Sequence, residues 1–149
     1  MNEIAEIING TLHSGIPVEI MEYSIDSRSV VTPEHTLFFA LTGNNHNGHD
    51  YIRTLYSDGM RAFVISEFRE EFNQLTGANF IVVENVLTAL QQLAAHHRQH
   101  TQAEVIGITG SNGKTVVKEW LYQLLANDHA VYRSPRSYNS QVGVPLSLL

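Results

Sequence analysis

The chain has 149 residues, a formal net charge of −6, no cysteine and 43% hydrophobic residues. This composition excludes a disordered chain, disulfides, thiolate metal sites and a cysteine nucleophile. The acidic balance argues against general affinity for nucleic acid, because no basic stripe is present to contact phosphates. The acidic, amphipathic start is unlike a signal peptide, and no apolar run approaches the roughly 18 residues of a membrane span. These features predict a cytoplasmic protein with no membrane partner.

The first hundred residues alternate short helical and extended patterns. We predict a helix over residues 3–9, a strand within residues 18–25 and a buried strand over residues 37–41. A helix over residues 50–57, a strand over 61–66, a connecting segment over 68–75 and a strand over 79–83 follow. This alternation predicts an α/β fold with a largely parallel or mixed sheet.

The next predicted helix begins after Asn85, a residue type that caps helix N-termini. Its expected buried face consists of Val86, Leu90, Leu93, Ala94 and His97. The helix ends in a histidine-rich run at residues 96–100. We favour stabilisation of the helix dipole over a metal cluster for these side chains. The polar residues 101–104 predict a domain boundary.

Residues 105–115 read Val-Ile-Gly-Ile-Thr-Gly-Ser-Asn-Gly-Lys-Thr. The apolar run over 105–109 predicts a buried strand. Apolar residues at helical spacing predict an amphipathic helix after the loop: Val116, Val117, Trp120, Leu121, Leu124 and Leu125. Strand, glycine turn and helix form the context of a phosphate-binding loop.

The residue types in this loop fit polyphosphate chemistry. Gly110 and Gly113 lack Cβ, so the backbone can adopt positive φ and approach a polyphosphate closely. Lys114 supplies a positive charge for the terminal phosphates, and Thr115 supplies a hydroxyl for Mg²⁺. A standard Walker A loop would have glycine at the position of Ile108. A glycine-rich turn beside a surface lysine is the alternative interpretation.

Two further stretches carry candidate polar groups. Residues 24–28, Ser-Ile-Asp-Ser-Arg, could bind a sugar or diphosphate, but we favour an Asx-type turn closed by an ion pair. The Asn- and Gly-rich loop at 42–50 contains His46 and His49, which we expect to form hydrogen bonds or face water. Later, Arg133 and Arg136 either face phosphate or lie in water.

Residues 129–133 predict another strand, and the apolar residues 142–149 end the chain. Such an ending, with no visible packing partner, suggests a fragment of a longer protein. We therefore expect residues 101–149 to be an incomplete domain that could drive self-association.

The spelling at residues 109–115 resembles the nucleotide loop of the Mur ligase family, which makes amide bonds in peptidoglycan synthesis. Folylpolyglutamate synthases have a similar loop. The resemblance to Mur ligases extends to residues 24–28, 37–43, 47–52, 92–98 and 138–146. It implies a small N-terminal α/β UDP-substrate domain at 1–100, followed by the truncated start of a P-loop ATPase domain at 101–149.

The resemblance also implies cofactors, partners and a reaction. ATP and Mg²⁺ would be the cofactors. The Gly-Val-Pro-Leu spelling at 143–146 is most similar to family members that add D-alanyl-D-alanine to UDP-N-acetylmuramoyl-tripeptide. The resemblance implies that this reaction, on a UDP-N-acetylmuramoyl-peptide, passes through an acyl phosphate. Members that add the third peptide residue are the alternative. Catalytic groups beyond residue 149 would be missing, so we expect the chain alone to be inactive.

By resemblance, the ATP-binding residues are Gly110, Ser111, Asn112, Gly113, Lys114 and Thr115, with Lys114 catalytic and Thr115 on the metal. The residues that fall where the family contacts uridine and diphosphate are Ile25, Ser27, Asn44, Asn45 and His46. Asn139 falls at a position near which the family approaches the nucleotide and the metal ion.

Three positions depart from the family pattern. Asn47 replaces an aspartate, and Ser140 and Gln141 replace an asparagine and a glutamate. The resulting spelling is similar to that of versions fused to an alanine racemase. Two other classes stay open: a small P-loop kinase, which would need an acidic strand after the loop, and a non-catalytic UDP-sugar-binding protein.

Overall fold

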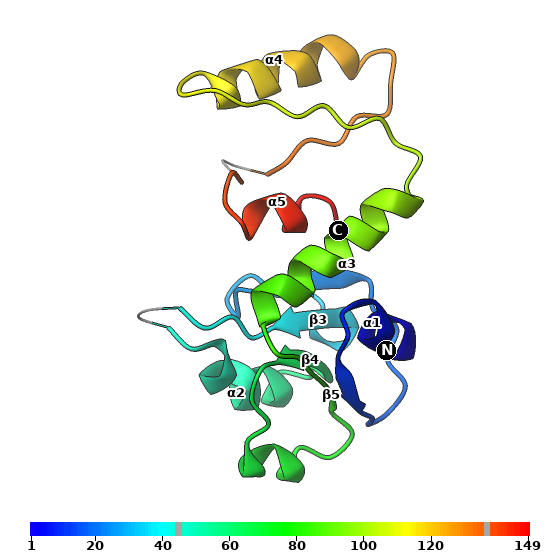
Figure 1. Cartoon of the computed structure of the whole chain (residues 1–149), viewed down its shortest axis with the longest axis vertical. Helices are drawn as coiled ribbons and strands as arrows, with labels where there is room; N and C mark the ends of the chain where they lie inside the picture. The colour runs from blue at the N-terminus through cyan, green and yellow to red at the C-terminus, as the bar shows by residue number, and fades with distance from the viewer. Residues whose placement is uncertain (44–45, 136–137) are drawn as a thin grey trace.

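The computed structural model describes residues 1–43, 46–135 and 138–149 (Figure 1). Its centre is a five-stranded sheet in the order β1-β5-β4-β3-β2. Strands β2 to β5 are parallel, and β1 pairs antiparallel with β5. The predicted mixed α/β fold is therefore confirmed. The strands are β1 (Thr11–His13), β2 (Glu22–Ser24), β3 (Thr36–Phe39), β4 (Ala62–Ile65) and β5 (Asn79–Val82).

Helices cover both faces of this sheet and continue beyond it. The α-helices are α1 (Asn2–Ile7), α2 (Ile52–Ser57), α3 (Val86–His100), α4 (Lys114–Leu125) and α5 (Gly143–Leu146). Three short 3₁₀ helices are η1 (Pro33–His35), η2 (Gly48–Tyr51) and η3 (Glu70–Gln74). In Figure 1, α5 and α3 lie between the sheet and α4. Within the described part of the chain, no helix is long and apolar enough to cross a membrane.

The period-two geometry of β3 divides its side chains between two hydrophobic cores. Leu37 and Phe39 join α1 and α3 on one face, whereas Phe38 joins α2 and η3 on the other. All three side chains are at most 1% exposed. Burial on both faces explains why this strand appears in the sequence as a continuous apolar run.

Helix α3 begins as predicted. The Asn85 side chain accepts a hydrogen bond from Thr88 N at 2.9 Å, which satisfies one of the free N–H groups of the first turn. Four of the five residues predicted for the apolar face are buried, but His97 is exposed. Ala89 is buried instead, because α3 crosses the sheet with its first half and extends past it with its second.

Three extended segments differ from their predictions. The strand expected within 18–25 is confined to β2, and β1 was missed because its three residues carry only one apolar side chain, Leu12. The strand predictions at 105–109 and 129–133 are wrong, since both segments are irregular. Val105 and Ile106 are 53% and 62% exposed. A strand needs a hydrogen-bonded neighbour, and the part of the chain that is described offers these segments none.

The last residues pack within the chain rather than projecting from it. Val142, Leu146 and Leu149 contact the core beneath α3. Gln91 Nε2 of α3 donates to the Gln141 carbonyl oxygen at 3.2 Å. Ser140 Oγ accepts from Gly143 N, the first residue of α5, at 3.0 Å and so holds the turn that leads into this helix. The expectation that the apolar ending lacks a packing partner is therefore wrong.

One buried polar side chain joins the N-terminal loop to the sheet. Asn79 of β5 is 2% exposed. Its Oδ1 accepts from Gly15 N at 2.8 Å, and its Nδ2 donates to the carbonyl oxygens of Ile16 at 2.8 Å and Arg61 at 3.1 Å. All of its hydrogen-bonding groups thus have partners, as burial requires.

Candidate functional site: a glycine loop and a sheet edge

The glycine-rich loop leads directly into helix α4. Gly113 precedes the helix with φ 79°, and Gly110 has φ 148°. Both values lie in the region that favours glycine, as predicted from the need for close backbone approach. No side chain caps α4 within the described chain, so its first N–H groups are available to an anionic ligand.

Lys114 folds back over this loop. Its Nζ donates to the carbonyl oxygens of Gly110 and Ser111. The ammonium group is therefore held above the turn, where it can exchange backbone carbonyls for phosphate oxygens. The Thr115 residue is exposed on the first turn of α4 and is accessible to a metal ion at a bound phosphate. Ser111 and Asn112 are exposed as well.

The apolar face of α4 is open. Every residue of α4 is described and none is buried. Val116, Trp120 and Leu124 are 50%, 62% and 71% exposed. The helix prediction for this segment is confirmed, but the strands predicted at 105–109 and 129–133 are not formed. The loop and helix are thus in place without a sheet beneath them.

Arg133 is exposed, as one of its two predicted environments requires, and it also has a structural partner. It forms an ion pair with Glu119 of α4, and its guanidinium lies 4.1 Å above the Tyr122 ring. Lys118 Nζ donates to the Ser134 carbonyl oxygen at 2.8 Å. These contacts hold residues 131–135 along α4 and border a cavity of about 410 Å³. Arg136 lies outside the described residues.

The second group of candidate residues follows the carboxyl ends of β2 and β3. These strands are parallel neighbours, so the turn that contains Ser27 and the loop that contains His46 leave the same edge of the sheet. Ligands of parallel α/β sheets bind at such edges. Ser27 is half-buried and His46 is exposed. Asn44 and Asn45 lie outside the described residues.

Ile25 has a different environment from Ser27. Its partly buried side chain packs against the core on the α3 face. Asn139 is exposed in the segment before α5. The structure therefore places Ser27 and His46 at one edge and the loop residues 110–115 at the start of α4, while Ile25 contributes to packing.

The turn after β2 is the predicted Asx turn. Asp26 Oδ1 accepts from Arg28 N at 3.0 Å and from Arg28 Nε at 2.9 Å, and Asp26 Oδ2 accepts from Nη2 at 2.8 Å. Ser29 Oγ donates to the Asp26 carbonyl oxygen at 3.0 Å. The hydrogen bonds from Arg28 lower the pKa of Asp26 to about 2.

We expect carboxyl NMR titration to give Asp26 a pKa of about 2, and Arg28→Gln to raise that pKa toward its ordinary value of 3.8. Because the folded pKa is lowered, the stabilisation is present above the unfolded value and is lost as pH falls from about 4 to about 2. Arg53→Gln, at an exposed position of α2, serves as the control and should leave the pKa of Asp26 unchanged. Titration of wild-type Asp26 near 3.8 would contradict the ion-pair assignment.

His49 is a buried structural histidine. It is 3% exposed; its Nδ1 lies 2.8 Å from Asn47 Oδ1 and its Nε2 accepts from Ser66 N at 3.1 Å. These bonds fix the proton on Nδ1 and join the loops after β3 and β4. Burial lowers the pKa of His49 below its ordinary value of 6.5, and the Arg69 cation adds to this effect. The hydrogen-bonding interpretation of His49 is confirmed.

We expect the free energy of unfolding to fall as pH decreases below 6.5, because the unfolded state binds a proton that native His49 takes up less readily. Urea unfolding across pH 5 to 7.5 measures this slope. His49→Gln should flatten it, whereas His35→Gln, whose exposed ring contacts the Glu19 carbonyl oxygen, should keep it. An unchanged slope in His49→Gln would refute the assignment.

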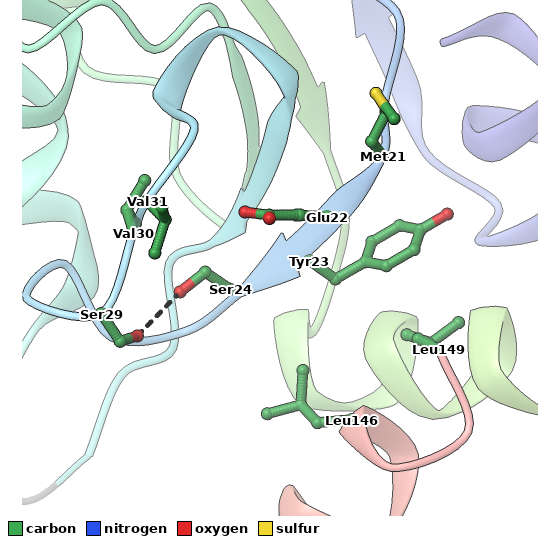
Figure 2. Close-up of a pocket in the computed structure, with 9 residues that line it drawn as sticks. All are labelled: Met21, Glu22, Tyr23, Ser24, Ser29, Val30, Val31, Leu146 and Leu149. Atoms are coloured by element: carbon green, nitrogen blue, oxygen red, sulfur yellow. Dashed lines mark hydrogen bonds between the residues drawn. The ribbon is translucent and has the colours of Figure 1, made fainter. Parts of the chain in front are cut away.

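A cavity of about 350 Å³ lies beside the outer edge of β2 (Figure 2). One wall is formed by Leu146 and Leu149 from the C-terminal segment. Ser24 and Ser29, whose hydroxyls are 3.5 Å apart, lie on the opposite side of the view. The complete lining is Met21, Glu22, Tyr23, Ser24, Ser29, Val30, Val31, Leu146 and Leu149. The C-terminal segment thus completes a surface of the N-terminal sheet.

Sequence reasoning missed two positioning residues. Asn47 Oδ1 accepts from His49 N at 3.1 Å as well as contacting the His49 ring, and so shapes the loop that carries His46. Ser140 Oγ accepts from Gly143 N and holds the turn before α5. A signal existed for Ser140, since serine side chains commonly form hydrogen bonds with nearby backbone N–H groups in turns. The signal for Asn47 was the short Asn-Gly-His run at the start of η2.

Comparison with known proteins identifies relatives along the whole chain. The family model described as "Mur ligase family, catalytic domain" matches residues 19–98. The UDP-N-acetylmuramoyl-tripeptide--D-alanyl-D-alanine ligase of Bacillus subtilis is 31% identical over 149 residues, which cover 100% of this chain and 32% of the relative. The ligase of the same name from Borreliella burgdorferi is 36% identical over 134 residues, covering 85% and 29%.

Solved structures agree. A UDP-N-acetylmuramoylalanyl-D-glutamyl-2,6-diaminopimelate--D-alanyl-D-alanyl ligase from Acinetobacter baumannii matches with a TM-score of 0.85 and 28% identity, over 99% of this chain and 32% of that one. MurF ligase from Thermotoga maritima in complex with ADP matches with a TM-score of 0.70 and 30% identity, over 85% and 28%. The chain therefore spans about a third of the length of these relatives. With the family model covering more than half of its residues, the chain belongs to the Mur ligase family.

Proposed function

We propose that the chain forms the substrate-binding and nucleotide-loop parts of an ATP-dependent cytoplasmic ligase that adds D-alanyl-D-alanine to UDP-N-acetylmuramoyl-tripeptide. One observation carries this proposal: a glycine loop with Lys114 at the start of α4 occurs in a chain that is similar from end to end to ligases of that name. The proposed division is a UDP-substrate domain at 1–100 and the beginning of an ATP-binding domain at 101–149.

The nucleotide would lie on the loop at the start of α4. Gly110 and Gly113 give the backbone the curvature that a polyphosphate needs. In this proposal Lys114 leaves the Gly110 and Ser111 carbonyl oxygens and neutralises charge on the terminal phosphates. Thr115 supplies an accessible hydroxyl for Mg²⁺, which also takes phosphate oxygens. The Lys114 ammonium, the backbone N–H groups of the loop and the Thr115 hydroxyl are the groups that binding of ATP and Mg²⁺ needs.

The UDP part of the substrate would lie at the carboxyl edge of β2 and β3. Ser27 offers a hydroxyl and His46 a ring nitrogen there, and Asn44 and Asn45 belong to the same proposed set. The Asp26–Arg28 pairs and the His49 bonds hold the surrounding turns, which reduces the entropy cost of binding. Ile25 would act by positioning this turn rather than by direct contact.

The proposed reaction is phosphoryl transfer followed by amide formation. The peptide carboxylate attacks the γ-phosphate of ATP, the bond to the β-phosphate breaks, and ADP leaves. The amine of D-alanyl-D-alanine then attacks the acyl phosphate, loses a proton and displaces inorganic phosphate. Lys114 and the N–H groups at the start of α4 stabilise charge on the transferred group. Asn139 is proposed near nucleotide and metal, in the segment that precedes α5.

Calorimetric titration of residues 1–149 with UDP-N-acetylmuramoyl-tripeptide, and separately with Mg-ATP, tests this proposal. We expect the UDP compound to bind and Ser27→Ala to weaken that binding. Ser57→Ala, on the exposed end of α2, is the matched control and should bind normally. ATP binding with no binding of the UDP compound would overturn the substrate assignment of residues 1–100.

A further inference from the structure

The loop between β3 and η2 carries His46, one of the residues proposed to contact the UDP part of the substrate. Thr42 and Asn47 form an antiparallel bridge across this loop, and Gly43 N donates to the His46 carbonyl oxygen at 2.8 Å. His46 itself is exposed. The position of His46 therefore depends on how firmly the base of the loop is held.

A buried ring holds the base of this loop. Asn47 Oδ1 accepts from Thr42 Oγ1 at 3.3 Å and from His49 N at 3.1 Å, and it lies 2.8 Å from His49 Nδ1. On the other side of the ring, His49 Nε2 accepts from Ser66 N at 3.1 Å. Because Ser66 directly follows β4, the parallel neighbour of β3, the ring joins two loops at one edge of the sheet. We call Asn47, His49 and Ser66 the His49 bridge.

The His49 bridge requires a neutral ring. Nδ1–H then donates to the Asn47 oxygen, and the Nε2 lone pair accepts from the Ser66 N–H. A proton on Nε2 would place two donors face to face, so this hydrogen bond would be lost. His49 is 3% exposed, and a buried cation without a partner is costly. Protonation therefore favours a conformation in which the ring leaves Ser66 and the loop loses its support.

The charged groups around the ring do not compensate for this cost. Burial is the largest cause that lowers the pKa of His49, and the Arg69 cation before η3 lowers it further. Glu67 after β4 and Asp50 of η2 act in the opposite direction, but more weakly. Asp50 pairs with Arg69 at 2.8 Å, and Glu71 of η3 lies 3.8 Å from the same guanidinium nitrogen. The ring is therefore neutral at pH 7 and takes up a proton only below the ordinary value of 6.5.

We propose that the His49 bridge makes binding of the UDP compound pH-dependent: neutral His49 holds His46 in its binding position, and protonated His49 releases the loop. This inference rests on the function proposed above for residues 1–100 and adds a regulatory group to that site. Because binding competes with proton uptake, affinity should be constant above the native pKa of His49 and should fall below it by up to about tenfold per pH unit. Protonation of His46 has the opposite effect, since a cation there attracts the diphosphate.

Calorimetric titration of the chain 1–149 with UDP-N-acetylmuramoyl-tripeptide from pH 7.5 to pH 5 tests the bridge. The carboxylates of the ligand stay ionised in this range, so the profile reports on the protein. His49→Gln, which is neutral throughout and offers an oxygen to Ser66 N, should retain its affinity at low pH. Asn47→Asp places a carboxylate beside His49 Nδ1, favours the charged ring and should move the loss of affinity to higher pH. His97→Gln, at an exposed position of α3, is the control and should keep the wild-type profile.

Amide hydrogen exchange without ligand gives a second readout. The protection factors of His49 N and Ser66 N should fall below the native pKa of His49 in the wild type but not in His49→Gln, while circular dichroism verifies that each protein is folded at each pH. Unchanged protection in the wild type, or an equal loss of UDP affinity in His49→Gln, would overturn the proposal. Loss of protection without any UDP binding at pH 7.5 would instead overturn the proposed function of residues 1–100, and with it the role of the bridge in binding.

Discussion

Asn79→Ala is expected to lower the free energy of unfolding by about 2 to 4 kcal/mol, the largest effect of any single polar substitution that we predict. The side chain makes three hydrogen bonds, to Gly15 N and to the carbonyl oxygens of Ile16 and Arg61. Alanine removes all three, at about 0.5 to 1.5 kcal/mol each. Gly15 N and the Ile16 carbonyl oxygen lose their side-chain partner, whereas the Arg61 carbonyl oxygen keeps its bond from the backbone N of residue 79 at 2.7 Å. Urea unfolding followed by circular dichroism measures the change.

Asn73→Ala provides the control for this prediction. Asn73 Nδ2 donates to the Glu70 carbonyl oxygen at 3.0 Å within η3, and the residue is exposed. Its substitution should change the free energy of unfolding by less than about 0.5 kcal/mol, as is usual for surface positions. A midpoint shift in Asn79→Ala no larger than that in Asn73→Ala would show that the bonds to residues 15 and 16 do not stabilise the sheet.

The contrast between β3 and residues 105–109 shows what local pattern can predict. Both are apolar runs, and both predict buried strands. β3 is formed because β2 and β4 pair with its two edges and helices cover both faces. Residues 105–109 have the same character but no neighbouring strand within the described chain. Strand propensity therefore gave the location of a possible strand, while pairing decided its formation.

The part of the candidate site that lies within one short segment, the glycine loop, was predictable because its proposed function requires particular residue types there. The glycines at 110 and 113, Lys114 and the helix after them follow from spacing alone, and the structure contains the turn and the helix. Long-range contacts were not predictable in this way. The bond between Gln91 and the Gln141 carbonyl oxygen joins residues 50 positions apart, and local periodicity carries no information about it.

Helix α5 illustrates the same limit. The sequence suggested an unfinished element, yet Leu146 and Leu149 pack this segment on the N-terminal core, and the Ser140 hydrogen bond to Gly143 N holds its first turn. The described residues 101–135 thus lie beyond the end of α3, and α5 packs on the core of the sheet again. Both ends of the segment that carries the glycine loop are therefore held on one scaffold, so substitutions in α5 should influence the loop through its position.

Lys114→Ala should weaken Mg-ATP binding by roughly 10- to 100-fold, which corresponds to the 1.5 to 3 kcal/mol of a hydrogen bond to a charged group. Among the residues that the structure describes, the wild-type ammonium donates to the carbonyl oxygens of Gly110 and Ser111, both exposed residues, so alanine leaves no buried group there without a partner. The free energy of unfolding should change little. The loss of affinity would then report a direct contact with phosphate rather than a damaged fold.

Lys118→Ala is the matched control, because Lys114 and Lys118 are the two lysines of the chain and both belong to α4. Lys118 Nζ contacts the Ser134 carbonyl oxygen and lies 3.3 Å from Glu119 Oε1, so its role is to hold residues 131–135 along the helix. Lys118→Ala removes one positive charge, as Lys114→Ala does, but from a position one helical turn farther from the loop. Equal weakening of ATP binding in both variants would indicate a general electrostatic effect and contradict the assignment of Lys114. Selective weakening in Lys114→Ala would support it, since the net charge is the same in both proteins and only the position of the ammonium group differs.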